Sequence, residues 1–138
     1  MRAWLAEPPA RTASEREPVW DFLALRAFAL RQWPLAAAAC EQASRIAPNP
    51  RILIMLGIAR TYVGDATGAA AAYRAVIARS PFEPVAWAGL AGVAARSGQQ
   101  ALADSARSRL RMFPQTGPRA REMRAVMAQY PEAFPAAR

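Results

Sequence analysis

The feature that most constrains this chain is a set of residues that recurs at a nearly constant interval. Trp20, Leu53 and Trp87 are separated by 33 and 34 residues. A series of small residues and a series of prolines keep almost the same spacing, at Ala36, Ala69 and Ala103 and at Pro48, Pro81 and Pro114. A period in this range is typical of solenoids, in which each unit is too small to bury its own apolar face. We therefore expect a stack of similar units.

The composition favours helices and excludes several kinds of chemistry. Of the 138 residues 54% are hydrophobic, largely alanine, which is a strong helix former. All 18 basic residues are arginine, and the absence of lysine and histidine excludes histidine bases, histidine metal ligands and lysine Schiff bases. Cys40 is the only cysteine, so neither an internal disulfide nor a thiolate metal site can form. No paired carboxylates, phosphate-binding glycine loop or nucleophile–base arrangement is visible. We expect no enzymatic activity, no cofactor and no metal.

Turn signals divide the chain into an arm, three units and a tail. We expect a flexible N-terminal arm over 1–16, helix pairs over 17–49, 50–83 and 84–117, and a capping helix and tail over 118–138. The turns inside the units are predicted at Gln32-Trp33-Pro34, Gly64-Asp65 and Ser97-Gly98. In the last helix the apolar residues Met123, Val126, Met127 and Tyr130 fall on one side. Such a terminal helix would cover the apolar face that the last unit otherwise exposes.

The sequence also bears on localisation. No apolar run approaches the ~20 residues that a membrane span requires. Glu7 and two prolines interrupt the start before a secretory apolar region develops. We expect a cytoplasmic protein by default, and a periplasmic domain without its leader or a fragment of a larger protein would look the same.

The units resemble the tetratricopeptide repeat, a helix–turn–helix of 34 residues with a Trp, Leu-Gly, Tyr, Ala and Pro pattern. The second unit carries the pattern most fully, at Leu53, Leu56, Gly57, Gly64, Ala69, Tyr73 and Pro81. The first unit departs from it with Arg31 at the turn glycine, and the third with Arg107 at the aromatic position. The resemblance implies an all-α fold, a right-handed α-solenoid of three helix-turn-helix repeats with a C-terminal capping helix. In this arrangement we expect Gly57 to lie where paired helices come closest, and Trp20 and Trp87 to belong to the core.

The resemblance further implies that the first helix of each repeat lines a concave groove. The groove positions carried over are Leu25, Phe28, Ile54, Ile58, Thr61, Tyr62 and Arg96, with a floor of small residues at Ala88 and Gly92. We expect this apolar strip to be exposed and to bind apolar anchor residues of a partner protein or peptide, as an adaptor, assembly factor or chaperone-like module would. Alternatively, the strip is covered by the arm, through Trp4 and Leu5, or by a second copy in a homodimer.

A cluster of arginines lies near the end of the expected stack, at Arg107, Arg111, Arg119, Arg121 and Arg124. The simplest interpretation is a solvated face with Asp104 and Glu122 as local partners. An acidic protein or an anionic membrane surface is the next candidate partner. Nucleic acid comes last, because neither a recognised module nor exposed stacking aromatics accompany the cluster.

Overall fold

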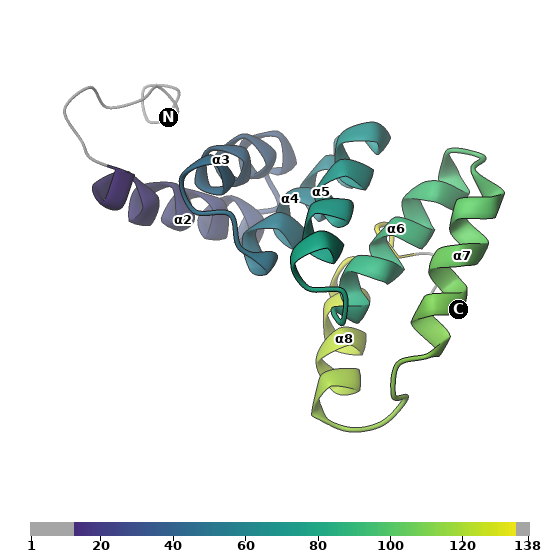
Figure 1. The fold of residues 1–138 in the computed structure, drawn as a ribbon. Coiled ribbons are helices and arrows are strands. Elements are labelled where there is room, and N and C mark those ends of the chain that lie inside the picture. Colours follow the sequence, from purple (N-terminus) through teal and green to yellow (C-terminus); the bar gives the residue numbers. More distant parts are fainter. Residues whose placement is uncertain (1–12, 135–138) are drawn as a thin grey trace.

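The computed structural model describes residues 13–134, with side chains from residue 19 onward, and this part of the chain is helical without strands (Figure 1). Its helices are α2 (Ala13–Ala29), α3 (Trp33–Ile46), α4 (Pro50–Tyr62), α5 (Ala66–Arg79), α6 (Pro84–Arg96), α7 (Gln100–Arg111) and α8 (Pro118–Gln129). From α2 to α7 each helix packs on the next, and α4 also packs on α6. The all-α prediction is therefore confirmed, and consecutive helix pairs stack side by side. None of the described helices is long and apolar enough to cross a membrane.

Local chemistry at the predicted turns explains the helix boundaries. Gly64 and Gly98 have φ angles of 85° and 73°, a left-handed conformation that glycine adopts without steric cost. The Asp65 carboxylate caps α5 by accepting the backbone N–H of Gly68 at 2.9 Å. Asn49 caps α4 in the same way through Ile52, at 3.0 Å. The two predicted turns around Gly64 and Gly98 are thus confirmed.

The first unit reaches the same turn geometry without glycine. Arg31 has a φ of 53° and is the only described residue other than glycine with a positive φ. It lies 33 residues before Gly64, so it takes the place that glycine holds in the other two units. A side chain in this conformation costs free energy, which other contacts of Arg31 must offset.

The N-terminal boundary differs from the prediction. Helix α2 begins at Ala13, so residues 13–16 of the expected arm are helical. Their sequence, Ala-Ser-Glu-Arg, contains three good helix formers, and the prediction gave too much weight to Pro18 as a helix start. Trp4 and Leu5 lie outside the described residues.

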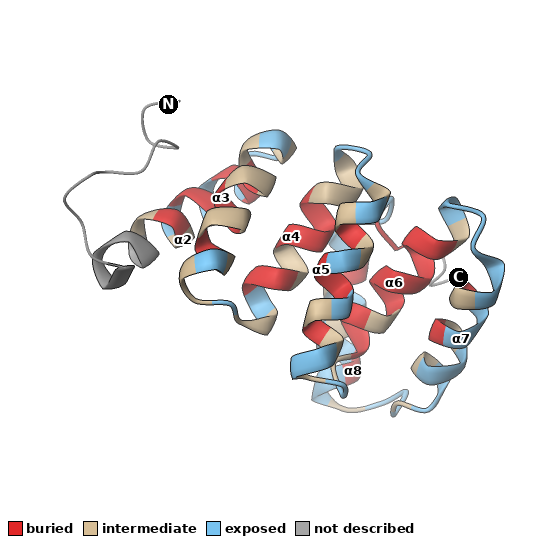
Figure 2. Ribbon diagram, turned by 45° about the horizontal axis from the view of Figure 1, so that its top comes forward, coloured by how far each residue is buried: buried red, intermediate tan, exposed pale blue. Residues whose placement is uncertain are grey.

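Buried residues run along the helices of all three units (Figure 2), and both bulky and small side chains at the predicted positions are among them. Trp20, Leu53, Leu56 and Leu90 are buried, and Ala36, Ala69 and Ala103 are fully enclosed. The ring of Tyr73 fills the space between α4 and α6, where a Cβ added to Gly57 or Gly89 would lie 2.7 or 2.3 Å from it. A small residue is therefore required at Gly57 by the Tyr73 ring, and the predicted closest approach of the paired helices there stays a prediction.

The expectation that Trp87 is a core residue is wrong in part. The side chain is only partly buried, and its indole N–H donates to the Pro81 carbonyl at 2.9 Å. The guanidinium of Arg109 lies 5.4 Å from the ring centroid. Trp87 thus sits at the rim of the core, where its polar edge has a partner.

Helix α8 does not cover the outer end of the stack. It packs on α6 and leads the chain back towards α2 and α4 (Figure 1). Ten of the thirteen residues of α6 are buried, and a helix that is apolar on all sides needs neighbours on all sides. By contrast, α7 buries only Ala103 and Ala106 and faces outward with charged residues, so it needs no cap. The predicted capping helix therefore covers the inner face instead.

Candidate functional site

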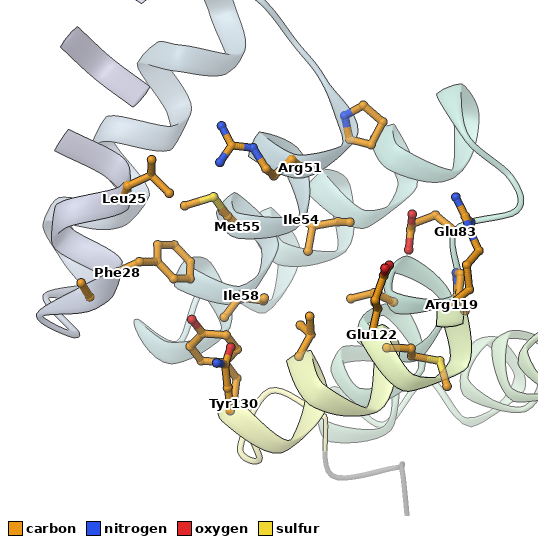
Figure 3. Close-up of a pocket in the computed structure, with 17 residues that line it drawn as sticks. Leu25, Phe28, Arg51, Ile54, Met55, Ile58, Glu83, Arg119, Glu122 and Tyr130 are labelled. Atoms are coloured by element: carbon orange, nitrogen blue, oxygen red, sulfur yellow. The ribbon is translucent and has the colours of Figure 1, made fainter. Parts of the chain in front are cut away.

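A hollow of about 660 Å³ lies between α2, α4, the start of α6 and α8 (Figure 3). Apolar side chains from three helices form most of its wall: Leu25 and Phe28 from α2, Ile54, Met55 and Ile58 from α4, and Met123 and Val126 from α8. Charged side chains of both signs also line it: Arg51, Glu83, Arg119 and Glu122. The hollow is thus an apolar groove with mixed charges around it.

The structure brings four of the predicted groove residues together in this hollow, but not with the expected exposure. Leu25 is 47% exposed and Ile54 is partly buried, as a binding surface requires. Phe28 is only 7% exposed and Ile58 only 2%, so the expectation that both present a free surface is wrong. The ring of Tyr130 reaches over Phe28, with 5.8 Å between the ring centroids (Figure 3). The returning C-terminal segment therefore covers one end of the predicted strip.

The other predicted groove positions lie outside the hollow. Thr61 is partly buried, and its hydroxyl donates to the Gly57 carbonyl one turn earlier, at 2.8 Å. Arg96 is exposed at the end of α6, where its charge helps to lower the pKa of Glu132. Ala88 and Gly92 are buried, so the small-residue floor expected in the groove belongs to the packed interior of α6.

An aromatic socket closes the hollow beside the turn between α2 and α3. We define the socket by the rings of Phe28, Trp33 and Tyr62, on which Tyr130 packs. Trp33 stacks on Tyr62 with centroids 4.3 Å apart and an angle of 9° between the rings. Tyr130 meets Trp33 edge to face at 5.8 Å and Tyr62 at 6.4 Å. Such geometry is favourable for aromatic pairs beyond the area that they bury.

Polar contacts surround the socket. The Arg31 guanidinium lies 5.8 Å from the Trp33 centroid and 5.5 Å from that of Tyr130, and it donates to the Gln129 carbonyl at 3.0 Å. The Tyr62 hydroxyl donates to the Glu132 carboxylate at 2.6 Å. Arg31 and Tyr62 thus fasten the end of α8 and the residues after it to the first two units.

The pKa values of Tyr62 and Glu132 are both shifted in the directions that their hydrogen bond requires. Burial and the bond to Glu132 raise the pKa of Tyr62 to about 12. The pKa of Glu132 is lowered, first by the hydrogen bond from Tyr62 and further by its own backbone N–H and the charges of Arg31 and Arg96. The ionised carboxylate is therefore the form that this end of the groove favours.

The structure does not gather the five predicted arginines into one basic surface. Arg107 pairs with Asp104 at 3.5 Å, Arg119 donates to the Phe82 carbonyl and Arg124 to that of Gln115. Arg111 and Arg124 line a second hollow of about 500 Å³ between α7 and α8, whereas Arg119 faces the groove. Arg121 is exposed on α8. The ion pair to Asp104 is the one expected from the sequence, and the remaining arginines meet different surroundings.

The sequence interpretation named Phe28 and Tyr62 of the socket as groove residues, but it missed Trp33 and the contacts of Arg31 and Tyr130. Trp33 and Arg31 were interpreted only as parts of a turn, and Tyr130 as part of a cap. The sequence does contain a pattern that indicates a further packed helix. Residues 84–95 have no charged side chain, which predicts a helix covered on every side. That pattern requires one more helix against α6, which the stack itself does not supply.

Among residues 13–134 no group of three or more His, Cys, Asp or Glu side chains lies close enough to hold a metal ion. Comparison with protein-family models, with curated proteins and with solved structures finds no match to this chain. What the site does is therefore inferred from its geometry.

Proposed function

We propose that this chain is a non-catalytic protein-binding module of the tetratricopeptide type, with three repeats in a right-handed solenoid. Its groove between α2, α4 and α8 takes an apolar segment of a partner protein. The observation that carries the proposal is an apolar wall, exposed at Leu25 and partly exposed at Ile54 and Met55, inside a hollow large enough for several side chains. Exposed apolar surface of this kind usually marks a contact site.

The surroundings of the groove match the anatomy of a recognition surface. An apolar centre is bordered by Arg51, Glu83, Arg119 and Glu122, and polar borders of this kind are typical of protein interfaces. A helix of the chain itself forms one wall of the groove, through Met123 and Val126 of α8. A partner segment with helical spacing of apolar residues is the ligand that fits such a wall.

The size of the groove sets the affinity that we expect. Three apolar anchors contribute about 2 kcal/mol each when they leave water. Ordering of the segment and loss of translational freedom offset part of this gain. The three anchors alone would give a dissociation constant of roughly 40 µM, so the balance corresponds to weaker, reversible binding, as expected of an adaptor or assembly factor.

Two leucines on α2 provide a matched test. Leu25 and Leu30 are 47% and 55% exposed, but only Leu25 lines the groove. We expect the wild type and Leu30→Glu to capture the same protein from a native lysate. Leu25→Glu should not capture it. A synthetic apolar segment of the captured protein should then show the same dependence on Leu25.

The test also has outcomes that contradict the proposal. Equal capture by the two variants would remove the groove from the interaction. If Leu25→Glu instead dissociates a homodimer seen by sedimentation, the groove is occupied by a second copy and the adaptor function is wrong.

A further inference from the structure

Helix α8 buries few of its residues, as α7 does. Ala120 and Met127 of α8 are buried, and Ala133 and Phe134 are buried just after it, whereas α6 buries ten residues. The N-terminus of α8 at Gly117 has no side-chain cap. The bonds from Arg31 to Gln129 and from Tyr62 to Glu132 are both exposed to solvent, where polar contacts contribute little. Few buried contacts and exposed hydrogen bonds are the marks of a segment that opens locally while the core stays folded.

The contacts of this segment nevertheless form a specific pattern. The Tyr130 ring fills the aromatic socket, and the carboxylate two residues later meets the Tyr62 hydroxyl near the charges of Arg31 and Arg96. Val126 and Met123, four and seven residues before Tyr130, line the hollow from the same side of the helix. The socket therefore receives the aromatic ring at the end of a helix and a carboxylate just beyond it, while two apolar residues of the same helix line the hollow.

The turn of the first unit supports a dedicated role for this contact. Arg31 holds a φ of 53° where the equivalent turns have Gly64 and Gly98. The Arg31 side chain packs on Trp33 and Tyr130 and donates to the Gln129 carbonyl. A glycine would remove the strain and also the contact with the C-terminal segment.

We propose that residues 118–134 are an internal ligand of the aromatic socket at the end of the groove, which a partner that reaches the socket must displace. The inference rests on the proposed function and deepens it, because it names the partner chemistry. The partner is a protein helix that repeats the pattern of α8, with apolar residues seven and four positions before an aromatic residue and a carboxylate two positions after it. Such a segment binds the socket only when α8 has left it, so α8 limits the affinity for weak ligands.

The test uses the full chain and a fluorescent synthetic peptide with the sequence of residues 118–134. Replacing Tyr130 and Glu132 together, by Tyr130→Ala and Glu132→Gln, releases the internal segment. We expect the peptide to bind this double variant at least tenfold more tightly than the wild type, because the tethered competitor is lost. Arg121→Gln, on an exposed position of the same helix, should bind the peptide as the wild type does. Equal affinity for the double variant and the wild type would overturn the proposal.

A second measurement keeps the proposal testable if the double variant fails to fold. Amide hydrogen exchange on the wild type should be at least tenfold faster in residues 118–130 than in α4 and α6, because α8 opens on its own. Exchange of α8 at the rate of the core would overturn the proposal. Peptide binding involves this chain alone, so it can succeed while capture of a foreign protein fails, and the two proposals are separable.

Discussion

Arg31 allows the cost of one strained turn to be separated from the contacts that its side chain makes. Its φ of 53° lies in the left-handed region, which costs a residue with a Cβ roughly 1–2 kcal/mol. Glycine relieves that cost but adds about 0.4–1 kcal/mol of freedom to the unfolded chain. We therefore expect Arg31→Gly to be more stable than Arg31→Ala by about 0.5–1 kcal/mol.

The side-chain contacts determine where both variants stand relative to the wild type. Each of the two cation–π contacts is worth about 0.5–1 kcal/mol at an exposed site. Both variants lose them, together with the bond to the Gln129 carbonyl. We expect Arg31→Ala to lower the free energy of unfolding by about 1–2 kcal/mol, and Arg31→Gly to lie between it and the wild type.

Urea denaturation followed by circular dichroism measures these differences, and Arg26 is the control. Arg26 is exposed and lies inside helix α2, so glycine there relieves no strain. At Arg26 the order should reverse, with alanine more stable than glycine. If Arg31→Ala is as stable as Arg31→Gly or more so, the strain at this turn is not present and the reasoning fails.

Three further predictions follow from the packing and charges. Gly89→Ala places a Cβ against the Tyr73 ring and should lower the free energy of unfolding, measured by urea denaturation, by about 1–3 kcal/mol. Adding Tyr73→Leu to this variant should recover part of that stability. An unchanged stability of Gly89→Ala would contradict the tight fit. Phe28→Glu or Ile58→Glu buries an unpaired charge and should lower the free energy of unfolding by more than about 3 kcal/mol; an unchanged melting temperature would show that these side chains are exposed after all. The pKa of Glu132 is lower in the folded chain than its ordinary value of 4.5. Its ionised form therefore stabilises the docked segment fully above pH 4.5, and this stabilisation is lost as the pH falls through the folded pKa. Carboxyl NMR titration checks this, and a folded pKa at or above that value would refute the contact with Tyr62.

Much of the fold was predictable because the signals were local. Glycine, proline and capping side chains fix turns through their own backbone preferences, and Gly64 with Asp65 shows this clearly. The need for a small residue at Gly57 was also predictable from the repeat pattern, but its contact with the Tyr73 ring was not. These features depend on neighbours within one or two helices.

The position of α8 was not predictable in the same way. The stripe of Met123, Val126, Met127 and Tyr130 shows that one side of the helix is covered, but it does not say against which surface. The surface on which α8 packs depends on residues far from it in the sequence. Helix α6 is apolar on all sides, whereas the outer face of α7 is polar. The exposure of Phe28 was misjudged for the same reason, because the side chain of Tyr130 that packs on it comes from 102 residues away in the sequence.

The central claim is that the C-terminal helix returns across the inner face of the stack and leaves an open apolar groove beside it. Nuclear Overhauser contacts between selectively labelled rings test it most directly, since the chain has only 3 tyrosines and 5 phenylalanines. We predict contacts of Tyr130 with Phe28 and Tyr62, whose ring centroids lie 5.8 and 6.4 Å from its own. Contacts of Tyr130 with α7 in their place would show that the helix caps the end of the stack, and the account would be wrong.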